Sequence, residues 1–427
     1  MQYDKIGNHL RLSQYGISIE MNTEGIGYPI YRMNEMHNML CDIDVDKYAD
    51  ISKDDYAHFA LKQGDVLFNR TNSFEWVGRT GVYYPTSNNE ERTFASYLVR
   101  FNPMQETILP EYLCAFLNSR HGVWDIKRRA RQSINQTNVN PEEVKEIDIP
   151  LLRMDIQLKI QEYFKSANVL RLQSRLAYDE ANQYLNQLLG IDNLVLTDGT
   201  ITEKKYSDFV CSTRLDAEYY QPKYDELLAL LRAFDTKPLS EIVSIKKSIE
   251  PGSEAYQTDG IPFIRVANLS KFGITDTDVY LSTEEYGDTI RPKKDTILLS
   301  KDGSVGIAHK VEEDADIITS GAILHLTVKD DSVIPDYLTL VLNSIIVKMQ
   351  AERDAGGSVI QHWKPSEIEK VVIPILDNEA QVQITEKVQE SFALRRESVR
   401  LLELAKTAVE VAIEQGEDKA MELLTIK

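Results

Sequence analysis

The chain repeats itself, and this duplication constrains its fold more than any other feature of the sequence. Four blocks of the first half return in the same order in the second half, at an offset that falls in small steps from 233 to 224 residues. The paired blocks are 27–33 and 260–266, 66–73 and 297–304, 110–119 and 335–344, and 141–160 and 365–384. Chance similarity would not keep this order, so the chain consists of two related modules with small loop deletions.

Each module is expected to begin with strands and to end in a long helix. Short runs rich in β-branched and aromatic residues, such as 81–84 and 322–328, are typical of strands. Pro110 and Pro335 favour short helices, since proline is tolerated in a first helical turn. Farther along, apolar and small residues recur at alternating steps of three and four, which predicts a long helix with a heptad seam. The seam includes Ile160, Leu170, Ala177, Ala181 and Leu188 in the first module, and Leu394, Leu401, Ala405 and Ala408 in the second.

We therefore expect an α+β protein with two tandem α/β domains, each followed by a long helix. Alanine and serine on both seams would let the helices pair closely, as an antiparallel coiled coil with pseudo-twofold symmetry. The expected segments are a first domain at 1–150, a central long helix at 151–190, a connector at 191–237, a second domain at 238–374 and a C-terminal long helix at 375–427. The alternative is two separate helices that each pack only on their own domain.

The connector carries two local signals. Asp198-Gly199 stands between alternating apolar residues and predicts a hairpin. Pro222 opens an apolar-periodic stretch that predicts a short helix.

Composition bounds the class of protein. A length of 427 residues suits two or three domains. Cys41, Cys114 and Cys211 form an odd, widely spaced set that fits reduced thiols in the cytoplasm. No apolar run approaches the roughly 18 residues that a membrane span needs, so we expect a cytoplasmic chain without a membrane partner.

The net charge is −19, and each of the five expected segments is acidic or weakly charged, none being strongly basic. Such a balance argues against a protein that coats DNA without specificity. DNA binding would depend on local basic patches or on basic partners.

The sequence contains no recognisable catalytic constellation. It has no Gly-x-x-x-x-Gly-Lys-Ser/Thr phosphate loop, no His-Glu-x-x-His and no Cys-x-x-Cys. Glu143-Val144-Lys145 resembles the tail of a nuclease motif, but such triplets are common and this one leads directly into the strand-like run 147–150. We therefore expect no catalytic residue and no metal site.

Two polar segments in each module are candidates for DNA contact. The first module carries 70–73, after a strand-like run, and 127–138, the densest basic stretch of the chain; their counterparts are 301–304 and 356–364. Arginine can pair with guanine and asparagine or glutamine with adenine, while serine and lysine hold phosphates. With Arg32, Arg79 and Arg265 added, the candidates are Arg32, Arg70, Asn72, Ser73, Arg79, Lys127, Arg128, Arg129, Arg131, Gln132, Gln136, Asn138, Arg265, Lys301, Ser304, Gln361, His362 and Lys364.

Less specific interpretations of these segments stay open. The segments 70–73 and 301–304 could be ordinary polar turns. The basic run 127–131 could be a solvated helix face, and Trp363 could be a core residue.

The chain resembles the specificity subunit of type I restriction-modification systems. The residues that carry the resemblance are 64–73, 300–306, 136–150 with Gln157, and 214–220. The resemblance covers essentially the whole chain and implies two target-recognition domains that alternate with two paired long helices. One departure is Lys294-Asp295-Thr296, which stands where the family usually has Gly-Asp and predicts a locally different turn.

The resemblance also implies a function and partners. The chain would be a non-catalytic subunit that reads a bipartite, asymmetric site in double-stranded DNA, with the long helices setting the spacing between half-sites. It would position two adenine methyltransferase subunits and, beyond them, restriction or translocase subunits. S-adenosylmethionine, ATP and Mg belong to those partners, so no cofactor is expected in this chain.

Three alternatives remain. The chain could serve a fused restriction-methylation enzyme or an orphan methyltransferase. It could be an acidic inhibitor that mimics DNA, whose charge should then cover a continuous face and leave the basic run 127–131 without a purpose. A stand-alone hydrolase is disfavoured by the missing motifs.

Overall fold

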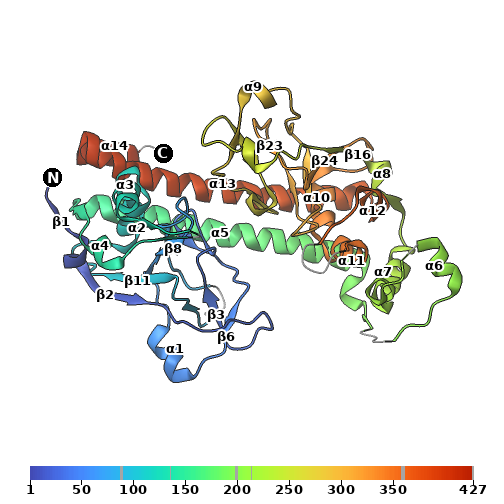
Figure 1. The fold of residues 1–427 in the computed structure, drawn as a ribbon, viewed down its shortest axis with the longest axis horizontal. Coiled ribbons are helices and arrows are strands. Elements are labelled where there is room, and N and C mark those ends of the chain that lie inside the picture. The colour runs from blue at the N-terminus through green and yellow to red at the C-terminus, as the bar shows by residue number, and fades with distance from the viewer. Residues whose placement is uncertain (87–89, 135, 198–200, 213, 357–360, 426–427) are drawn as a thin grey trace. The chain divides into compact units, whose positions relative to one another are not determined.

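The computed structural model describes residues 1–425 except 87–89, 135, 198–200, 213 and 357–360. The chain divides into two compact units, unit 1 (Met1–Gln173 with Leu394–Lys427) and unit 2 (Ser174–Ala393). Two long helices, α5 (Met154–Leu189) and α13 (Asn378–Gln415), each contribute to both units (Figure 1). The units therefore cut across the sequential segments expected from the sequence.

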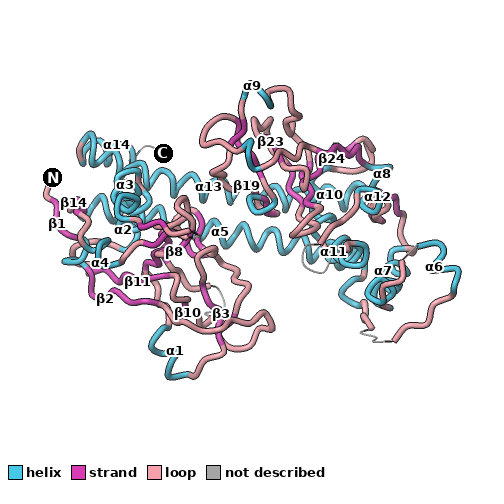
Figure 2. Tube along the Cα trace, viewed as in Figure 1, coloured by secondary structure: helices cyan, strands magenta, loops and turns pink. Residues whose placement is uncertain are grey.

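Unit 1 is built on a six-stranded sheet with the order β2-β11-β7-β9-β5-β4, of which β2 and β11 are labelled in Figure 2. Its strands are β2 (Leu10–Tyr15), β11 (Leu98–Pro103), β7 (Val66–Asn69), β9 (Thr80–Val82), β5 (Leu40–Cys41) and β4 (Met36–His37). Smaller sheets contain β10 (Thr93–Phe94), β3 (Tyr28–Tyr31) and β6 (Tyr48–Ala49); β12 (Arg131–Gln132), β13 (Thr137–Asn138) and β8 (Thr71–Asn72); and β1 (Tyr3–Lys5) with β14 (Asp148–Pro150). The helices are α1 (Lys53–Phe59), α2 (Pro110–Asn118), α3 (Arg120–Arg129), α4 (Pro141–Lys145) and α14 (Glu417–Thr425).

Unit 2 contains the second sheet domain and the connector. Its main sheet has the order β16-β24-β21-β22, formed by β16 (Val243–Lys247), β24 (Ile323–Val328), β21 (Ile297–Ser300) and β22 (Ala308–Lys310). The other strands are β20 (Tyr280–Leu281), β17 (Ile261–Ile264) and β23 (Ile318–Thr319); β18 (Leu269–Ser270) with β19 (Gly273–Ile274); and β15 (Thr236–Pro238) with β25 (Val372–Pro374). The helices are α6 (Tyr206–Ser212), α7 (Pro222–Leu231), α8 (Leu239–Ile242), α9 (Thr283–Tyr286), α10 (Pro335–Asn343), α11 (Ile345–Asp354) and α12 (Pro365–Ile368).

Four strands of the main sheets and two smaller sheets correspond between the units. The order β2-β11-β7-β9 in unit 1 corresponds to β16-β24-β21-β22 in unit 2. In both units a central short strand, β3 or β17, pairs parallel with one neighbour and antiparallel with the other. The β1–β14 pair corresponds to β15–β25, and both pairs are antiparallel. The duplication predicted from the sequence is therefore confirmed by the topology.

Equivalent buried glutamines show the duplication at the level of single side chains. The Gln157 amide accepts from the Leu109 main-chain N–H (2.9 Å) and donates to the Leu152 carbonyl (2.8 Å), which ties the start of α5 to the start of α2. Gln381 accepts from the Ile334 N–H (2.9 Å) in the same way, at the start of α13. Both glutamines are 1% exposed, so each of their polar atoms must find a partner inside the protein.

The predicted local difference at Asp295 is wrong. Gly64 in unit 1 has φ +85°, and Asp295, its counterpart in unit 2, has φ +64°. Aspartate is one of the few non-glycine residues that tolerate this left-handed conformation. The main-chain N–H of Gly64 donates to Tyr83 (3.0 Å) and that of Asp295 to Val311 (2.8 Å), so the same turn forms with a different residue.

The two long helices pack antiparallel within each unit. The contacts are Ser391 with Ser174 (2.7 Å) and Lys387 with Glu180 (2.5 Å) in unit 2, and Ser398 with Ala167 (2.7 Å) in unit 1. The residue numbers rise along α13 as they fall along α5, as antiparallel pairing requires. Ser174 and Ser391 are fully buried, and their small side chains let a hydroxyl on one helix reach a main-chain carbonyl on the other.

Each core combines one sheet domain with opposite ends of the two helices. In unit 1, Phe164 of α5 packs in the same apolar cluster as Ala408 of α13; in unit 2, Leu185 of α5 packs with Ile384 of α13. The alternative in which each helix packs only on its own domain is therefore wrong.

The predicted seam is mostly buried, with three half-buried exceptions. Ile160, Ala177, Ala181, Leu401, Ala405 and Ala408 are buried. Leu170, Leu188 and Leu394 are only half-buried, whereas Leu185 and Leu189 lie in the core. The buried stripe is wider than a strict heptad seam because these helices also face the sheet domains.

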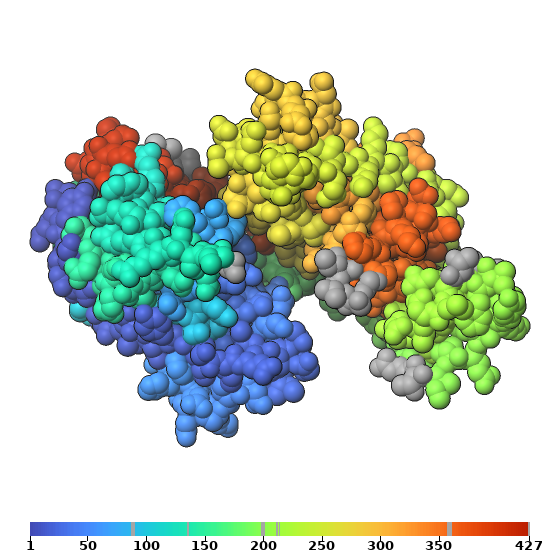
Figure 3. All heavy atoms as spheres, in the orientation of Figure 1, coloured from blue at the N-terminus to red at the C-terminus, as the bar shows by residue number. Residues whose placement is uncertain are grey.

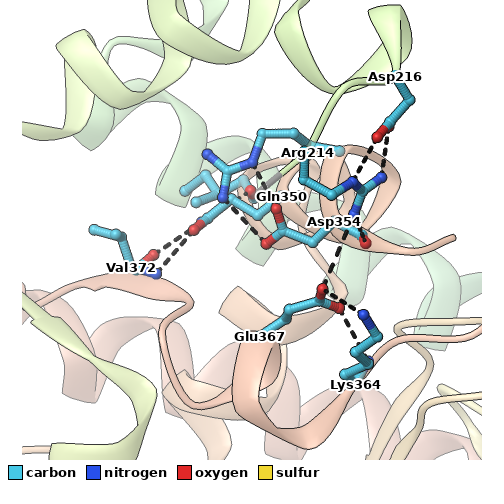
Figure 4. A network of polar contacts seen from close by, with 9 residues as sticks. Arg214, Asp216, Gln350, Asp354, Lys364, Glu367 and Val372 are labelled. Carbon is cyan, nitrogen blue, oxygen red and sulfur yellow. Dashed lines mark hydrogen bonds and ion pairs between the residues drawn. The ribbon is translucent and has the colours of Figure 1, made fainter. Parts of the chain in front are cut away.

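The connector folds onto the second sheet domain. The predicted hairpin falls on residues 198–200, outside the described part of the chain, and the flanking residues 194–197 and 201–205 form no strand. The helix predicted after Pro222 is α7. Arg214, at the centre of the network in Figure 4, pairs with Asp216 (2.6 Å) and donates to the Asp354 carbonyl (2.9 Å).

Candidate nucleic-acid interface

The two candidate segments of the first module meet in one small sheet. β13 pairs antiparallel with both β12 and β8, so residues 137–138 lie between residues 131–132 on one side and residues 71–72 on the other. The Thr71 hydroxyl donates to the Asn138 amide oxygen at 2.6 Å. Segments that are some 60 residues apart in the sequence thus form a single polar surface.

Unit 2 brings its corresponding segments together in the same way. Asp302 and His362 form an antiparallel bridge, and His362 Nδ1 lies 2.9 Å from Asp302 Oδ1. The Gly303 N–H donates to the Gln361 carbonyl (2.9 Å), and the Trp363 N–H donates to the Lys301 carbonyl (2.8 Å). Both modules therefore build a composite polar surface from the two segments that the sequence singled out.

The exposed part of these surfaces combines amide and hydroxyl side chains with cations. The exposed amide and hydroxyl candidates are Ser73, Gln132 and Gln136 in unit 1, and Ser304 and Gln361 in unit 2, and Arg131, His362 and Lys364 are exposed as well. Asn72 and Asn138 are half-buried, and the Asn72 side chain accepts from the Ser73 N–H (2.8 Å). Such groups can read base edges in a groove but contribute little to phosphate neutralisation.

The arginines of the basic run are paired with carboxylates. Arg128 Nε and Arg129 Nη1 lie 2.6 and 2.5 Å from the same Asp125 carboxylate oxygen, and Arg131 pairs with Glu143 at 2.5 Å. These arginines border an open depression of about 440 Å³. Arg128 and Arg131 keep 51% and 76% of their side-chain surface exposed, so both remain within reach of a phosphate.

The cations of unit 2 are balanced in the same manner. Lys301 pairs with Asp302, and Lys364 Nζ lies 3.8 Å from Glu367. Burial alone would raise the pKa of Asp302. The hydrogen bonds from Lys301 and His362 outweigh this effect and bring the pKa of Asp302 below its usual value. Asp302 therefore stays ionised and neutralises part of the surface.

Arg32 and Arg265 occupy equivalent positions and are held by carboxylates of their own domains. Arg32 Nε donates to Glu35 at 2.8 Å, and Arg265 Nη2 donates to Asp278 at 3.2 Å. Neither residue belongs to the composite surfaces described above.

The ammonium group of Lys127 binds main-chain atoms of its own domain. Its ammonium group donates to the main-chain carbonyls of Phe74, Glu75 (3.0 Å) and Val77 (3.0 Å). Burial lowers the pKa of Lys127 to about 8. All three of its donors hold the 74–77 turn against α3, so the structure places this lysine as a support and not as an exposed cation.

Aromatic residues that the sequence interpretation missed support the remaining arginines. The guanidinium of Arg70 lies 5.1 Å from the centre of the Tyr15 ring, and that of Arg79 lies 3.1 Å from the Trp76 ring. Stacking fixes a guanidinium plane without cancelling its charge. Trp76 lies three residues before Arg79 and could have been noticed in the sequence, whereas Tyr15 meets Arg70 only through the fold.

Neither a metal site nor a membrane-spanning helix is found among the described residues. Within the described ranges, no three His, Cys, Asp or Glu side chains gather as a metal site would require. None of the described helices is long and apolar enough to span a bilayer. Trp363 is 1% exposed and belongs to the core of unit 2.

The proteins to which this chain is similar are of one kind. Residues 232–397 match the model of the type I restriction modification DNA specificity domain. The putative type I restriction enzyme MjaX specificity subunit of Methanocaldococcus jannaschii is 30% identical over 152 residues, which cover 35% of each chain. The type I restriction enzyme EcoKI specificity subunit of Escherichia coli is 22% identical over 179 residues, 41% of this chain and 38% of that protein. The chain thus aligns with little more than a third of the length of these curated relatives.

Among solved structures, the S subunit of a type I restriction-modification system from M. genitalium aligns with 100% of this chain and 96% of its own. The sequence identity is 14% and the TM-score is 0.39.

Proposed function

We propose that the whole chain is the DNA sequence-specificity subunit of a type I restriction-modification system, because residues 232–397 match the model of the DNA specificity domain of such systems. Each sheet domain reads one half of a bipartite, asymmetric target in double-stranded DNA. The long helices α5 and α13 set the spacing between the two half-sites.

The observation that carries this proposal is the repeated composite surface. In unit 1 the segments 70–73 and 131–138 join through β8 and β13, and in unit 2 the segments 301–304 and 361–364 join through main-chain hydrogen bonds. Two surfaces of one design with different side chains suit a protein that reads two different short sequences. An asymmetric target follows from that difference.

The side chains of these surfaces are better suited to recognising bases than to binding DNA tightly. Exposed glutamines and serines and half-buried asparagines can pair with base edges, whereas the cations nearby are largely balanced by carboxylates. Since phosphate contacts supply most of the affinity of DNA-binding proteins, a partner should provide further positive charge.

We propose that this partner is an adenine methyltransferase, present as two subunits, with restriction or translocase subunits bound beyond it. The chain itself contributes no catalytic group and holds no cofactor. S-adenosylmethionine, ATP and Mg act in the partner subunits, where base modification and DNA translocation take place.

Co-expression with the proteins encoded by the neighbouring genes tests the proposal. We expect a methyltransferase among them to co-purify with this chain and the cells to carry N6-methyladenine in one split sequence motif. A stable complex that methylates no defined motif, or a chain that binds no methyltransferase, would show that the proposal is wrong.

A further inference from the structure

Helices α3 and α11 are equivalent elements of the two modules. Each follows a nine-residue helix that begins with proline, and a serine, Ser119 or Ser344, occupies the N-cap of each. Both helices contain ten residues at a constant offset of 225, so Trp124 corresponds to Met349 and Arg128 corresponds to Arg353. Differences in exposure at these positions reveal what covers one helix and leaves the other open.

In unit 2 the connector covers this face of α11. Met349 is 3% exposed and shares an apolar cluster with Tyr224 and Leu227 of α7. The guanidinium of Arg353 lies 5.3 Å from the centre of the Tyr219 ring, and its side chain is 19% exposed. Figure 3 shows the light-green connector lying against the orange segment that contains α11 and α12.

In unit 1 the corresponding face of α3 is open. Trp124 is 64% exposed, and the guanidinium of Arg128 lies 4.7 Å from the centre of its ring with 51% of its side chain exposed. A tryptophan side chain offers roughly 150–250 Å² of largely apolar surface and is rarely left in water without a partner. Val123, one residue earlier, is 38% exposed, and its counterpart Lys348 is exposed as well.

We propose that the Trp124–Arg128 face of α3 is a docking surface for an amphipathic helix of the methyltransferase partner. This inference rests on the proposed function, because that function supplies the partner. The docking helix presents aromatic and aliphatic side chains at helical spacing, as Tyr224, Leu227 and Leu231 of α7 do in unit 2. An aromatic ring on that helix takes the place that Tyr219 occupies beside Arg353.

The internal repeat decides between a protein and DNA as the occupant. The equivalent face in unit 2 is covered by a protein segment, and its arginine stacks on a tyrosine. Arg128 is also balanced by Asp125, which lies on the same helix and would repel a phosphate. Interface hot spots are enriched in tryptophan and arginine, which matches this pair.

Substitution of Trp124 tests the surface in the co-expressed complex. We expect Trp124→Ala to weaken methyltransferase binding at least tenfold, as measured by titration of the purified subunits. Val123→Ala is the matched control, because this position is exposed in both modules, and it should bind like the wild type. Trp124→Glu should act more strongly than Trp124→Ala, since it places a charge in an apolar contact.

The possible results distinguish a failure of the docking surface from a failure of the proposed function, on which the docking surface rests. Wild-type binding by Trp124→Ala and Trp124→Glu would overturn the docking surface and leave the specificity subunit intact. Normal assembly with weaker DNA binding would assign the face to DNA and also overturn it. If the wild-type chain binds no methyltransferase, the proposed function fails, and the inference fails with it.

Discussion

Lys127 shows how a candidate DNA contact can serve the architecture of its site. Its ammonium group bonds three main-chain carbonyls of the 74–77 turn, and burial lowers its pKa to about 8 from an ordinary value of 10.5. The turn follows Asn72 and Ser73, which belong to the composite surface of unit 1. Lys127 therefore holds the turn that follows this surface against α3.

The lowered pKa predicts a specific pH dependence of stability. Between about pH 8 and pH 10.5 the unfolded chain keeps a proton on Lys127 that the folded chain releases, so this residue's contribution to stability rises with pH in that window. Lys127→Met should lose this dependence, and it should cost about 1–2 kcal/mol at neutral pH through the lost hydrogen bonds. Chemical denaturation of both proteins from pH 7 to pH 10 measures the effect, and parallel curves would contradict it.

The arginine cluster supports a prediction about salt dependence. Replacement of Arg129 and Arg131 by alanine should weaken DNA binding by the assembled complex, because Arg131 keeps 76% of its side-chain surface exposed despite its ion pair. Arg128 stays unchanged in this variant because it belongs to the proposed docking surface of α3. Each lost phosphate contact should reduce the slope of log K against log salt by about 0.9. Arg400→Ala on α13, where Arg400 pairs with Glu397, is the control. An unchanged slope in a folded double variant would assign Arg129 and Arg131 to a solvated face.

Some of the ion pairs of the basic run could be predicted from the sequence, and others could not. Asp125 precedes Arg128 and Arg129 by three and four residues, a spacing that places the three side chains together on one helix face. The Arg131–Glu143 pair spans a turn and a short helix, and the Lys127 contacts depend on the packing of α3 against a distant loop. The sequence therefore identified the segments but not which cations remain exposed.

At the scale of elements, Pro110 and Pro335 predicted α2 and α10, and the apolar periodicity of the sequence predicted α5, α7 and α13. The β4–β5 hairpin of unit 1 and its counterpart β18–β19 were missed, because two-residue strands carry almost no pattern. The antiparallel pairing of α5 and α13 was expected, but the composition of each core was not. Each unit combines opposite ends of both helices, which only tertiary contacts reveal.

The buried serines between the long helices predict a strict size limit. Ser391 is fully buried and its hydroxyl reaches the Ser174 carbonyl at 2.7 Å. Ser391→Leu should destabilise the protein by about 1–3 kcal/mol, because added methylenes in a close-packed contact force the helices apart. Glu390→Leu, one residue earlier and exposed, should have little effect. Equal midpoints of chemical denaturation for the two variants would contradict this close packing.

For the whole molecule, the charge balance bears on the proposed binding of DNA. The net charge of −19 repels DNA, and most candidate cations are already paired within the chain. We therefore expect the isolated chain to bind its target weakly and to gain specific affinity only with the methyltransferase. Fluorescence anisotropy with one labelled duplex, with and without the partner, measures the gain. Equally tight, sequence-specific binding by the isolated chain would contradict this prediction.

The central claim is that each sheet domain reads one half of a split DNA site, and an exchange of one domain tests it most directly. Residues 238–374 would be replaced by the corresponding domain of another family member, and methylated adenines would be mapped by single-molecule sequencing in cells that also produce the methyltransferase. The account predicts a split motif in which one half changes while the other half and the spacing stay the same. Changes in both halves, or an unchanged motif in an active complex, would contradict it.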